Sequence, residues 1–244
     1  MLSQALDPYC ISPDAACSGV EAYAALAEAA CAYLSQLDAH CRVDDRTAGA
    51  LVTRIRGTGP GVSFGSLVAA IQRDFAVEYE TPFEGSMNVS GAALPASAIL
   101  GGHRDDGFLF LRFAPGTQDL PLHIHPQSDR FIYVIGGRGF FHVSAAPLNA
   151  VGPHTIRHVP ARDRDAFMFR RGVVHTFSTA EHELLLLSYH RPFIPLEDDS
   201  QYHVGNNPLT PEAFLAGYRA MISFDAAWTC LTRAVPVHTE CAWR

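Results

Sequence analysis

The stretch of sequence that decides the fold runs from His123 to Gly139 and reads His-Ile-His-Pro-Gln-Ser-Asp-Arg-Phe-Ile-Tyr-Val-Ile-Gly-Gly-Arg-Gly. Its first three residues place two histidines, His123 and His125, two positions apart, and a β-rich run follows them. Because successive side chains of a strand point to opposite faces, His123 and His125 point to the same face. Two imidazoles on one face supply half of a site for a first-row transition metal.

A third histidine, His175, ends a second stretch that begins at Arg164 and reads Arg-Asp-Ala-Phe-Met-Phe-Arg-Arg-Gly-Val-Val-His. Together the two stretches resemble the two sequence motifs of the cupins. The first motif has a glycine, HxH, three or four residues, a glutamate, six residues and a glycine; the second reads Gly-Asp-x-x-x-x-Pro-x-Gly-x-x-His. The resemblance covers roughly a third of the chain, from about residue 107 to 192. It implies a metal held by His123, His125 and His175.

The chain departs from the cupin motifs at three places. Arg164 stands where a turn glycine is usual, Arg170 replaces the usual proline, and the glutamate of the first motif is missing. Counting forward from His125 puts Asp129 in the place of the glutamate, as a candidate fourth ligand. Counting back from Tyr-Val-Ile-Gly-Gly137 puts Arg130 there, and we favour this alignment because more residues match.

The two alignments predict different surroundings for the metal. Asp129 and Arg130 are neighbours, so in a regular strand only one of them points into the barrel. A guanidinium has no free lone pair and stays protonated, so Arg130 cannot bind a metal. With Arg130 at the glutamate position, three histidines hold the metal, and Arg130 either turns away or binds an anionic substrate. Asp129 then supports the ligands from outside or faces solvent.

Three further residues are candidates for supporting the metal ligands or binding substrate. Arg112, on the strand before the first motif, could bind a substrate carboxylate if it points inward, and a surface position is the alternative. The phenol of Tyr133 can face either way. His142 either supports the metal ligands or is an ordinary core or surface histidine. Other histidines carry no motif and stay unassigned, among them His103, His154, His158, His182, His190 and His203.

Composition narrows the class of protein. The chain has 244 residues, 48% of them hydrophobic and 18% charged, with a net charge of -7, which favours a soluble globular protein and argues against nucleic acid or an anionic membrane as a partner. The six cysteines show no CxxC spacing, so we expect free thiols in a reducing compartment. No apolar run is long enough to span a membrane, and the N-terminus lacks a basic leader. We therefore predict a cytoplasmic location.

Residues 1–77 are predicted to form a helical extension that packs on the barrel. Ser18-Gly-Val-Glu21 is a capping box that opens a first helix, Asp44 or Asp45 could cap a second, and apolar residues from Phe64 to Phe75 at helical spacing indicate a third. The expected apolar face of the first helix comprises Val20, Tyr23, Ala27, Ala30, Cys31, Leu34 and Leu37, and that of the second comprises Ala48, Leu51, Val52 and Ile55. A DNA-binding helix-turn-helix is the alternative, but residues 1–77 hold eight acidic residues against five arginines.

The remaining chain is predicted to form one mainly β domain and a short extension. Short β-rich segments separated by turns recur from about residue 107, as in a sandwich or barrel. The resemblance implies a cupin double-stranded β-helix, or jelly-roll barrel, over residues 78–195. Residues 196–244 are expected to form a C-terminal extension with one helix, opened by Thr210-Pro-Glu.

The resemblance and the three histidines favour a metal-dependent enzyme. Within the cupins, three-histidine Fe(II) dioxygenases exist, so the function we predict is a non-haem Fe(II) oxygenase or dioxygenase. Its partners would be a small organic substrate and O2, with a homodimer as a further expectation. Zn, Mn or Ni are alternative metals. An O2-independent lyase or isomerase, and a ligand-binding or regulatory cupin without turnover, are the alternative functions.

Overall fold

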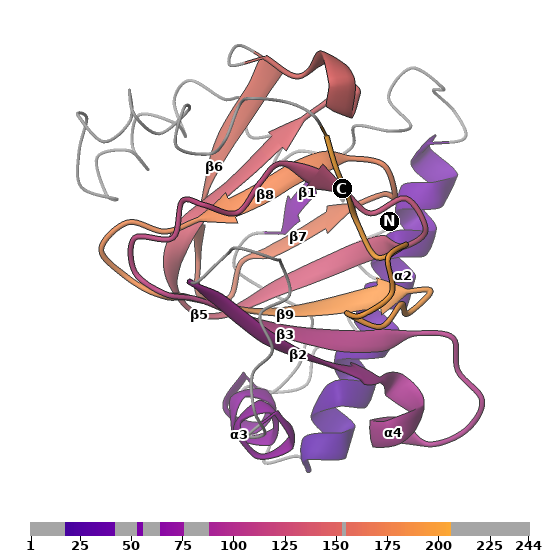
Figure 1. The fold of residues 1–244 in the computed structure, drawn as a ribbon. Coiled ribbons are helices and arrows are strands. Elements are labelled where there is room, and N and C mark those ends of the chain that lie inside the picture. Colours follow the sequence, from indigo (N-terminus) through magenta and orange to yellow (C-terminus); the bar gives the residue numbers. More distant parts are fainter. Residues whose placement is uncertain (1–17, 42–52, 56–63, 76–87, 153–154, 206–244) are drawn as a thin grey trace.

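The computed structural model describes residues 18–41, 53–55, 64–75, 88–152 and 155–205 (Figure 1). More of these residues belong to antiparallel strands than to helices, and the strands curl into a barrel, which confirms the predicted mainly β class. The strands are β1 (Thr53–Ile55), β2 (Val89–Pro95), β3 (Gly107–Phe113), β4 (His123–Ile124), β5 (Asp129–Ser144), β6 (Ile156–Arg162), β7 (Ala166–Phe169), β8 (Val174–Ser178), β9 (Leu184–Arg191) and β10 (His203–Val204). The helices are α2 (Gly19–Cys41), α3 (Phe64–Asp74), α4 (Ala96–Leu100) and the 3-10 turn η2 (Leu148–Ala150).

Strand β5 belongs to both halves of the barrel. Its first part pairs with β7 and β9 in the first sheet, which also contains β1, β2 and β3. Its last part, from Arg138 to Ser144, pairs with β6 and β8 in the second sheet, which also contains β4 and β10. The sequence pattern predicts two separate strands here, but a bulge between Val134 and Gly136 bends one continuous strand instead. Gly137 follows the bulge with φ 78°, and an added Cβ would collide with the Glu183 carbonyl. Gly137 of the first motif is therefore needed for this bend.

The two faces of the first sheet bury different groups of side chains. On β5, Ile132 and Val134 point into the barrel, where they join Phe167, Phe169 and Leu186. The alternate residues Phe131, Tyr133 and Ile135 point outward to the helices. This alternation follows from the strand period of two, and because both faces are covered, it fixes the register.

The helices α2 and α3 cover the outer face of the first sheet (Figure 1). The predicted capping box is confirmed, since the Ser18 amide donates to Glu21 Oε2 at 2.6 Å and the Glu21 amide donates to Ser18 Oγ at 3.2 Å. Tyr33 stacks on Phe131 with ring centroids 5.8 Å apart. The expected helix from Phe64 is also confirmed, as α3. The assignment of Val20 to the buried face is wrong, because Val20 is exposed, and Ala22 and Leu26 are buried instead.

The extensions of the barrel differ in part from those expected from the sequence. The sequence predicts Ile55 in a second helix, but Thr53–Ile55 form strand β1. This strand pairs with β7 and extends the first sheet, because tertiary pairing overrides local propensity. Beyond residue 195, β10 pairs with β4, so the second sheet continues into the predicted C-terminal extension. The predicted helix after Thr210 lies outside the described residues. No helix in the described part of the chain is long and apolar enough to cross a bilayer.

Candidate metal centre

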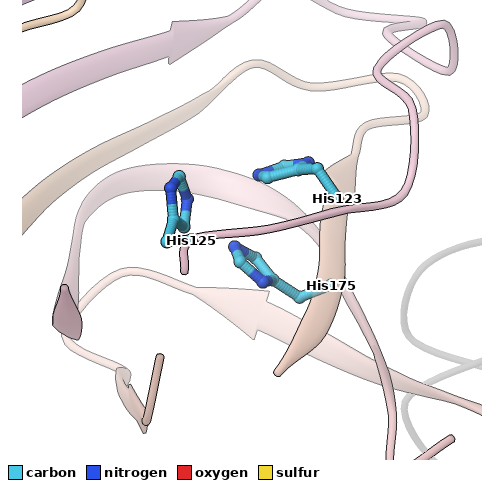
Figure 2. A group of neighbouring side chains, drawn as sticks. All are labelled: His123, His125 and His175. Carbon is cyan, nitrogen blue, oxygen red and sulfur yellow. The ribbon is translucent and has the colours of Figure 1, made fainter. Parts of the chain in front are cut away.

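The side chains of His123, His125 and His175 converge at one end of the barrel interior (Figure 2). His123 in β4 lies directly opposite His175 in β8, and His125 follows β4. The ring centroids are 5.0 Å apart for His123 and His125, 4.5 Å for His123 and His175, and 5.1 Å for His125 and His175. One nitrogen from each ring lies within 4.8 Å of the other two. This convergence of three ring nitrogens makes the cluster a candidate metal site.

A backbone carbonyl fixes the tautomer of each ring. The Nδ1 of His123 donates to the Pro121 carbonyl at 2.9 Å, that of His125 to the Gln201 carbonyl at 2.6 Å, and that of His175 to the Val173 carbonyl at 2.9 Å. Because a carbonyl only accepts, each Nδ1 carries the proton and the lone pair is on Nε2. Such carbonyl contacts orient metal-binding histidines in proteins and raise their basicity.

The three histidines are held in the neutral form that binds a metal. All three are at least nine-tenths buried, and burial lowers the pKa of each below its ordinary value of 6.5. The pKa of His123 falls to about 4, mainly by loss of hydration and in smaller part through the nearby Arg130 cation. No proton then competes with a metal at neutral pH. The donor set therefore fits a first-row divalent ion.

A cavity beside the histidines is mostly apolar. Its volume is about 40 Å³, counted as the space that the centres of water-sized groups can occupy. This leaves room for a few atoms beyond the metal. Its polar lining besides the three histidines comprises Arg130, Ser188, His190, Gln201 and Tyr202. Leu109, Leu111, Phe113, Leu120, Ile132 and Phe177 form most of the apolar wall.

Arg130 occupies the inward position that the favoured alignment predicts. Only 1% of it is exposed, and it is the largest fully buried side chain in the described part of the chain. Its Nη2 donates to Gln201 Oε1 at 2.6 Å, whereas Nε and Nη1 have no hydrogen-bond partner among the described residues. The guanidinium therefore lines the cavity where a cupin glutamate is expected.

Asp129 points away from the histidines, so the structure does not support it as a fourth ligand. Arg171 donates to its carboxylate three times: from the backbone amide to Oδ1 at 2.8 Å, from Nε to Oδ1 at 3.3 Å, and from Nη2 to Oδ2 at 2.9 Å. These hydrogen bonds outweigh the effect of burial and hold the pKa of Asp129 below its ordinary value. Asp129 thus anchors the turn after β7, because its neighbour Arg130 takes the inward face.

The structure also keeps three other candidates out of the cavity. Arg112 is exposed and its Nε lies 3.0 Å from Glu183 Oε2. Tyr133 is buried against the helices, where burial raises the pKa of its phenol to about 12. His142 is buried on the outer face of the second sheet, with Nδ1 2.6 Å from His158 Nδ1 and Nε2 2.6 Å from Ser178 Oγ. The bulge after Val134 reverses the inward parity of β5 and turns His142 outward.

Two lining residues, His190 and Gln201, were not predicted. His190 is 1% exposed and lies opposite Arg130 in the β5–β9 register. Its Nε2 lies 3.0 Å from Ser188 Oγ, and its Nδ1 has no hydrogen-bond partner among the described residues. The alternating pattern Ser188-x-His190 is a local signal for two polar residues on one face of a β9 strand that is otherwise apolar. Gln201 carries no such signal.

The backbone tolerates the arginine in the second motif. Arg164 adopts φ 65°, the left-handed conformation that a glycine usually supplies. Its amide donates to the Val134 carbonyl at 2.8 Å, and the Val134 amide donates to the Asp165 carbonyl at 2.8 Å. The turn before β7 is therefore kept, although the residue is not a glycine.

Comparisons with known proteins find a family match and several distant structural likenesses. A family model, "Cupin domain", matches residues 109–188. A search of curated proteins finds no match. Among solved structures, one of DMSP lyases RdDddP and RnDddQII is 16% identical with a TM-score of 0.44, over 59% of this chain and 70% of the other. The polyketide cyclase RemF from Streptomyces resistomycificus is 19% identical with a TM-score of 0.41, over 64% and 94%.

A recombinant oxalate oxidase in complex with glycolate is 14% identical with a TM-score of 0.40, over 64% of this chain and 76% of the other. At such identities and scores, the activities of these three proteins do not transfer to this chain. The family match includes the segments that carry all three histidines. Residues 109–188 of this chain therefore match a cupin domain.

Proposed function

We propose that this protein is a metal-dependent enzyme, a non-haem Fe(II) oxygenase or dioxygenase that acts on a small organic molecule. The observation that carries the proposal is the set of three buried histidines, each with its Nδ1 proton on a backbone carbonyl. Three protein ligands leave coordination positions for other molecules, which a catalytic metal needs and a structural one lacks. When bound, Fe(II) would supply the redox chemistry and the sites for O2 and substrate.

The residues of this chain would bind the metal, orient the substrate and keep water out of the cavity. His123, His125 and His175 would hold the metal through Nε2. The leucine and phenylalanine side chains of the cavity exclude water, which strengthens every electrostatic interaction inside. Zn, Mn and Ni remain alternative metals. O2 as co-substrate, a homodimer and a cytoplasmic location stay predictions.

A second candidate, an O2-independent lyase or isomerase, is favoured by one observation. Such a reaction needs a group that moves a proton, and His190 is a buried imidazole in the cavity. Its Nδ1 has no hydrogen-bond partner in the described part of the chain. His190 would therefore be the proton-transferring group of such a reaction.

Metal analysis and oxygen uptake test the proposal together. The protein would be purified without O2 and its metal content measured, for the wild type, for His175→Ala and for His182→Ala as an exposed histidine control. We expect about one iron per chain in the wild type and control, and none in His175→Ala. A panel of small organic molecules would then be assayed with and without O2. Equal turnover without O2 would favour the lyase or isomerase, and zinc as the native metal would argue against the oxygenase.

A further inference from the structure

The cavity contains a buried cation without a buried anion. Arg130 is 1% exposed, and Gln201 Oε1, its one hydrogen-bond acceptor among the described residues, is uncharged. No aspartate or glutamate is among the described residues that line the cavity. The adjacent carboxylate, Asp129, is bonded to Arg171 on the outside. A buried charge without a counter-charge is strongly disfavoured, so the site is complete only with an anion.

The surrounding residues hold the guanidinium in a fixed position. Gln201 Nε2 donates to the Ile194 carbonyl at 3.1 Å, which orients Gln201 Oε1 toward Arg130 Nη2. The backbone carbonyl of the same glutamine accepts from His125 Nδ1 at 2.6 Å. Gln201 thus connects the cation to one of the three histidines of the candidate metal centre, and it fixes the position of each relative to the other.

A second polar group is next to the guanidinium. His190 faces Arg130 across the β5–β9 pair, and its ring centroid is 6.5 Å from that of His125. Two guanidinium nitrogens, Nε and Nη1, and the His190 Nδ1 have no hydrogen-bond partner among the described residues. These three atoms belong to two residues that line one mostly apolar cavity, which the histidine triad also lines.

We infer that Arg130, held by Gln201 and accompanied by His190, is a carboxylate-binding subsite, and that the substrate is a small organic acid. Its carboxylate would accept hydrogen bonds from Arg130, a strong charge-assisted interaction in a dry site. Its reacting end would lie toward the three histidines. A carboxylate fits better than a phosphate, because the walls are mostly apolar and offer few donors for more oxygens. The inference rests on the proposed function only where it places the reacting end of the substrate beside the three histidines.

Binding of lactate and of its neutral amide, lactamide, tests this subsite directly. Both would be titrated by calorimetry into Co(II)-loaded and into metal-free protein, with the visible absorption of Co(II) as a second readout. We expect the wild type to bind lactate at least about tenfold more tightly than lactamide, as one charge-assisted hydrogen bond predicts. R130Q should lose this preference and keep its metal content. R112Q, which removes an exposed arginine, should behave as the wild type.

The outcomes separate this inference from the proposed function. A wild type that binds metal but does not prefer lactate overturns the subsite and leaves the metal site standing. A preference for lactate in a protein that binds no metal, lost in R130Q, supports the subsite and overturns the metal proposal. Inorganic phosphate that binds as tightly as lactate would overturn the assignment to carboxylates. If R130Q does not fold, the lactate and lactamide comparison on the wild type, with thermal melting as readout, decides alone.

Discussion

Two groups of histidines point to opposite faces of the second sheet. His175 in β8 is opposite Val143 of β5 and points into the barrel with His123 and His125. One residue away on each strand, Thr176 is opposite His142, which points outward to His158. Burial is the largest cause that lowers the pKa of the histidines in both groups. Burial and a depressed pKa therefore do not distinguish a metal site from an ordinary histidine pair.

The partners of the ring nitrogens make the difference. Each imidazole of the inner group donates Nδ1 to a backbone carbonyl, so its lone pair is on Nε2. His142 uses both nitrogens within the protein, one with His158 and one with Ser178. The inner group is thus prepared to bind a metal, whereas the outer group is a closed hydrogen-bonded network. Four predictions test this contrast, and the largest expected effect comes first.

Substitution of one inner histidine should abolish metal binding, and substitution of the outer one should not. We expect His175→Ala to lower metal affinity by more than about 100-fold, since loss of a ligand exceeds the 10–100-fold cost of losing its supporting contact. His142→Ala should retain nearly the full affinity. Competition with a chelator measures both. Equal metal loss in the two variants would remove the distinction between the groups.

The metal-free protein should lose stability as the pH falls from about 6.5 toward 4. The pKa of His123 is about 4 in the folded state, and His125, His142, His175 and His190 are lowered by burial too. All five bind protons more readily when unfolded, so acid favours unfolding. The contribution of these neutral histidines to the free energy of unfolding is complete above the pKa that they have in the unfolded chain. It is lost as the pH falls from that value toward the folded-state pKa.

Urea midpoints of the metal-free protein at pH 7.5, 6 and 5 measure this loss. The carboxylates of Asp106 and Asp129 do not affect this measurement, because folding lowers their pKa from 3.8. Their contribution to the free energy of unfolding is lost only at a pH below this range. A constant midpoint between pH 7.5 and 5 would contradict the burial of neutral histidines.

Loss of the outer histidine should affect folding rather than metal binding. His142→Ala leaves a small cavity and removes the partner of both His158 and the buried Ser178. We expect the free energy of unfolding to fall by about 1–3 kcal/mol, as for other buried hydrogen-bonded groups. Urea unfolding of the variant and of the exposed control His182→Ala checks this. A His142→Ala variant as stable as the wild type would show that the network contributes little.

The smallest effect is expected at Asp129. Its partner Arg171 is about half exposed, with 48% of its side chain accessible, so Asp129→Ala should cost no more than about 1 kcal/mol. Metal affinity should stay within about twofold, because the carboxylate does not face the histidines. The same chelator competition decides this. A large fall in affinity would show that Asp129 is a ligand after all.

The sequence by itself determines the features that depend on local spacing. The HxH pair places two imidazoles on one face, because the strand period of two holds over a few residues. The resemblance of the two motifs to those of cupins implies the barrel and the convergence of His175 with this pair. The capping box and the helix from Phe64 are likewise local patterns, and both are present. The alignment that places Arg130 inward also depends on counting within one strand.

Only the tertiary structure decides the features that depend on pairing between distant segments. Thr53–Ile55 became a strand because β7 offers an unpaired edge. His142 points outward because a bulge seven residues earlier reverses the parity of β5, and no residue spacing shows a bulge. Gln201 lies beside Arg130 although the sequence separates them by 71 residues, and His190 lies opposite Arg130 only through the β5–β9 register. Strand register is set by the burial of whole faces, so it cannot be computed from any one strand.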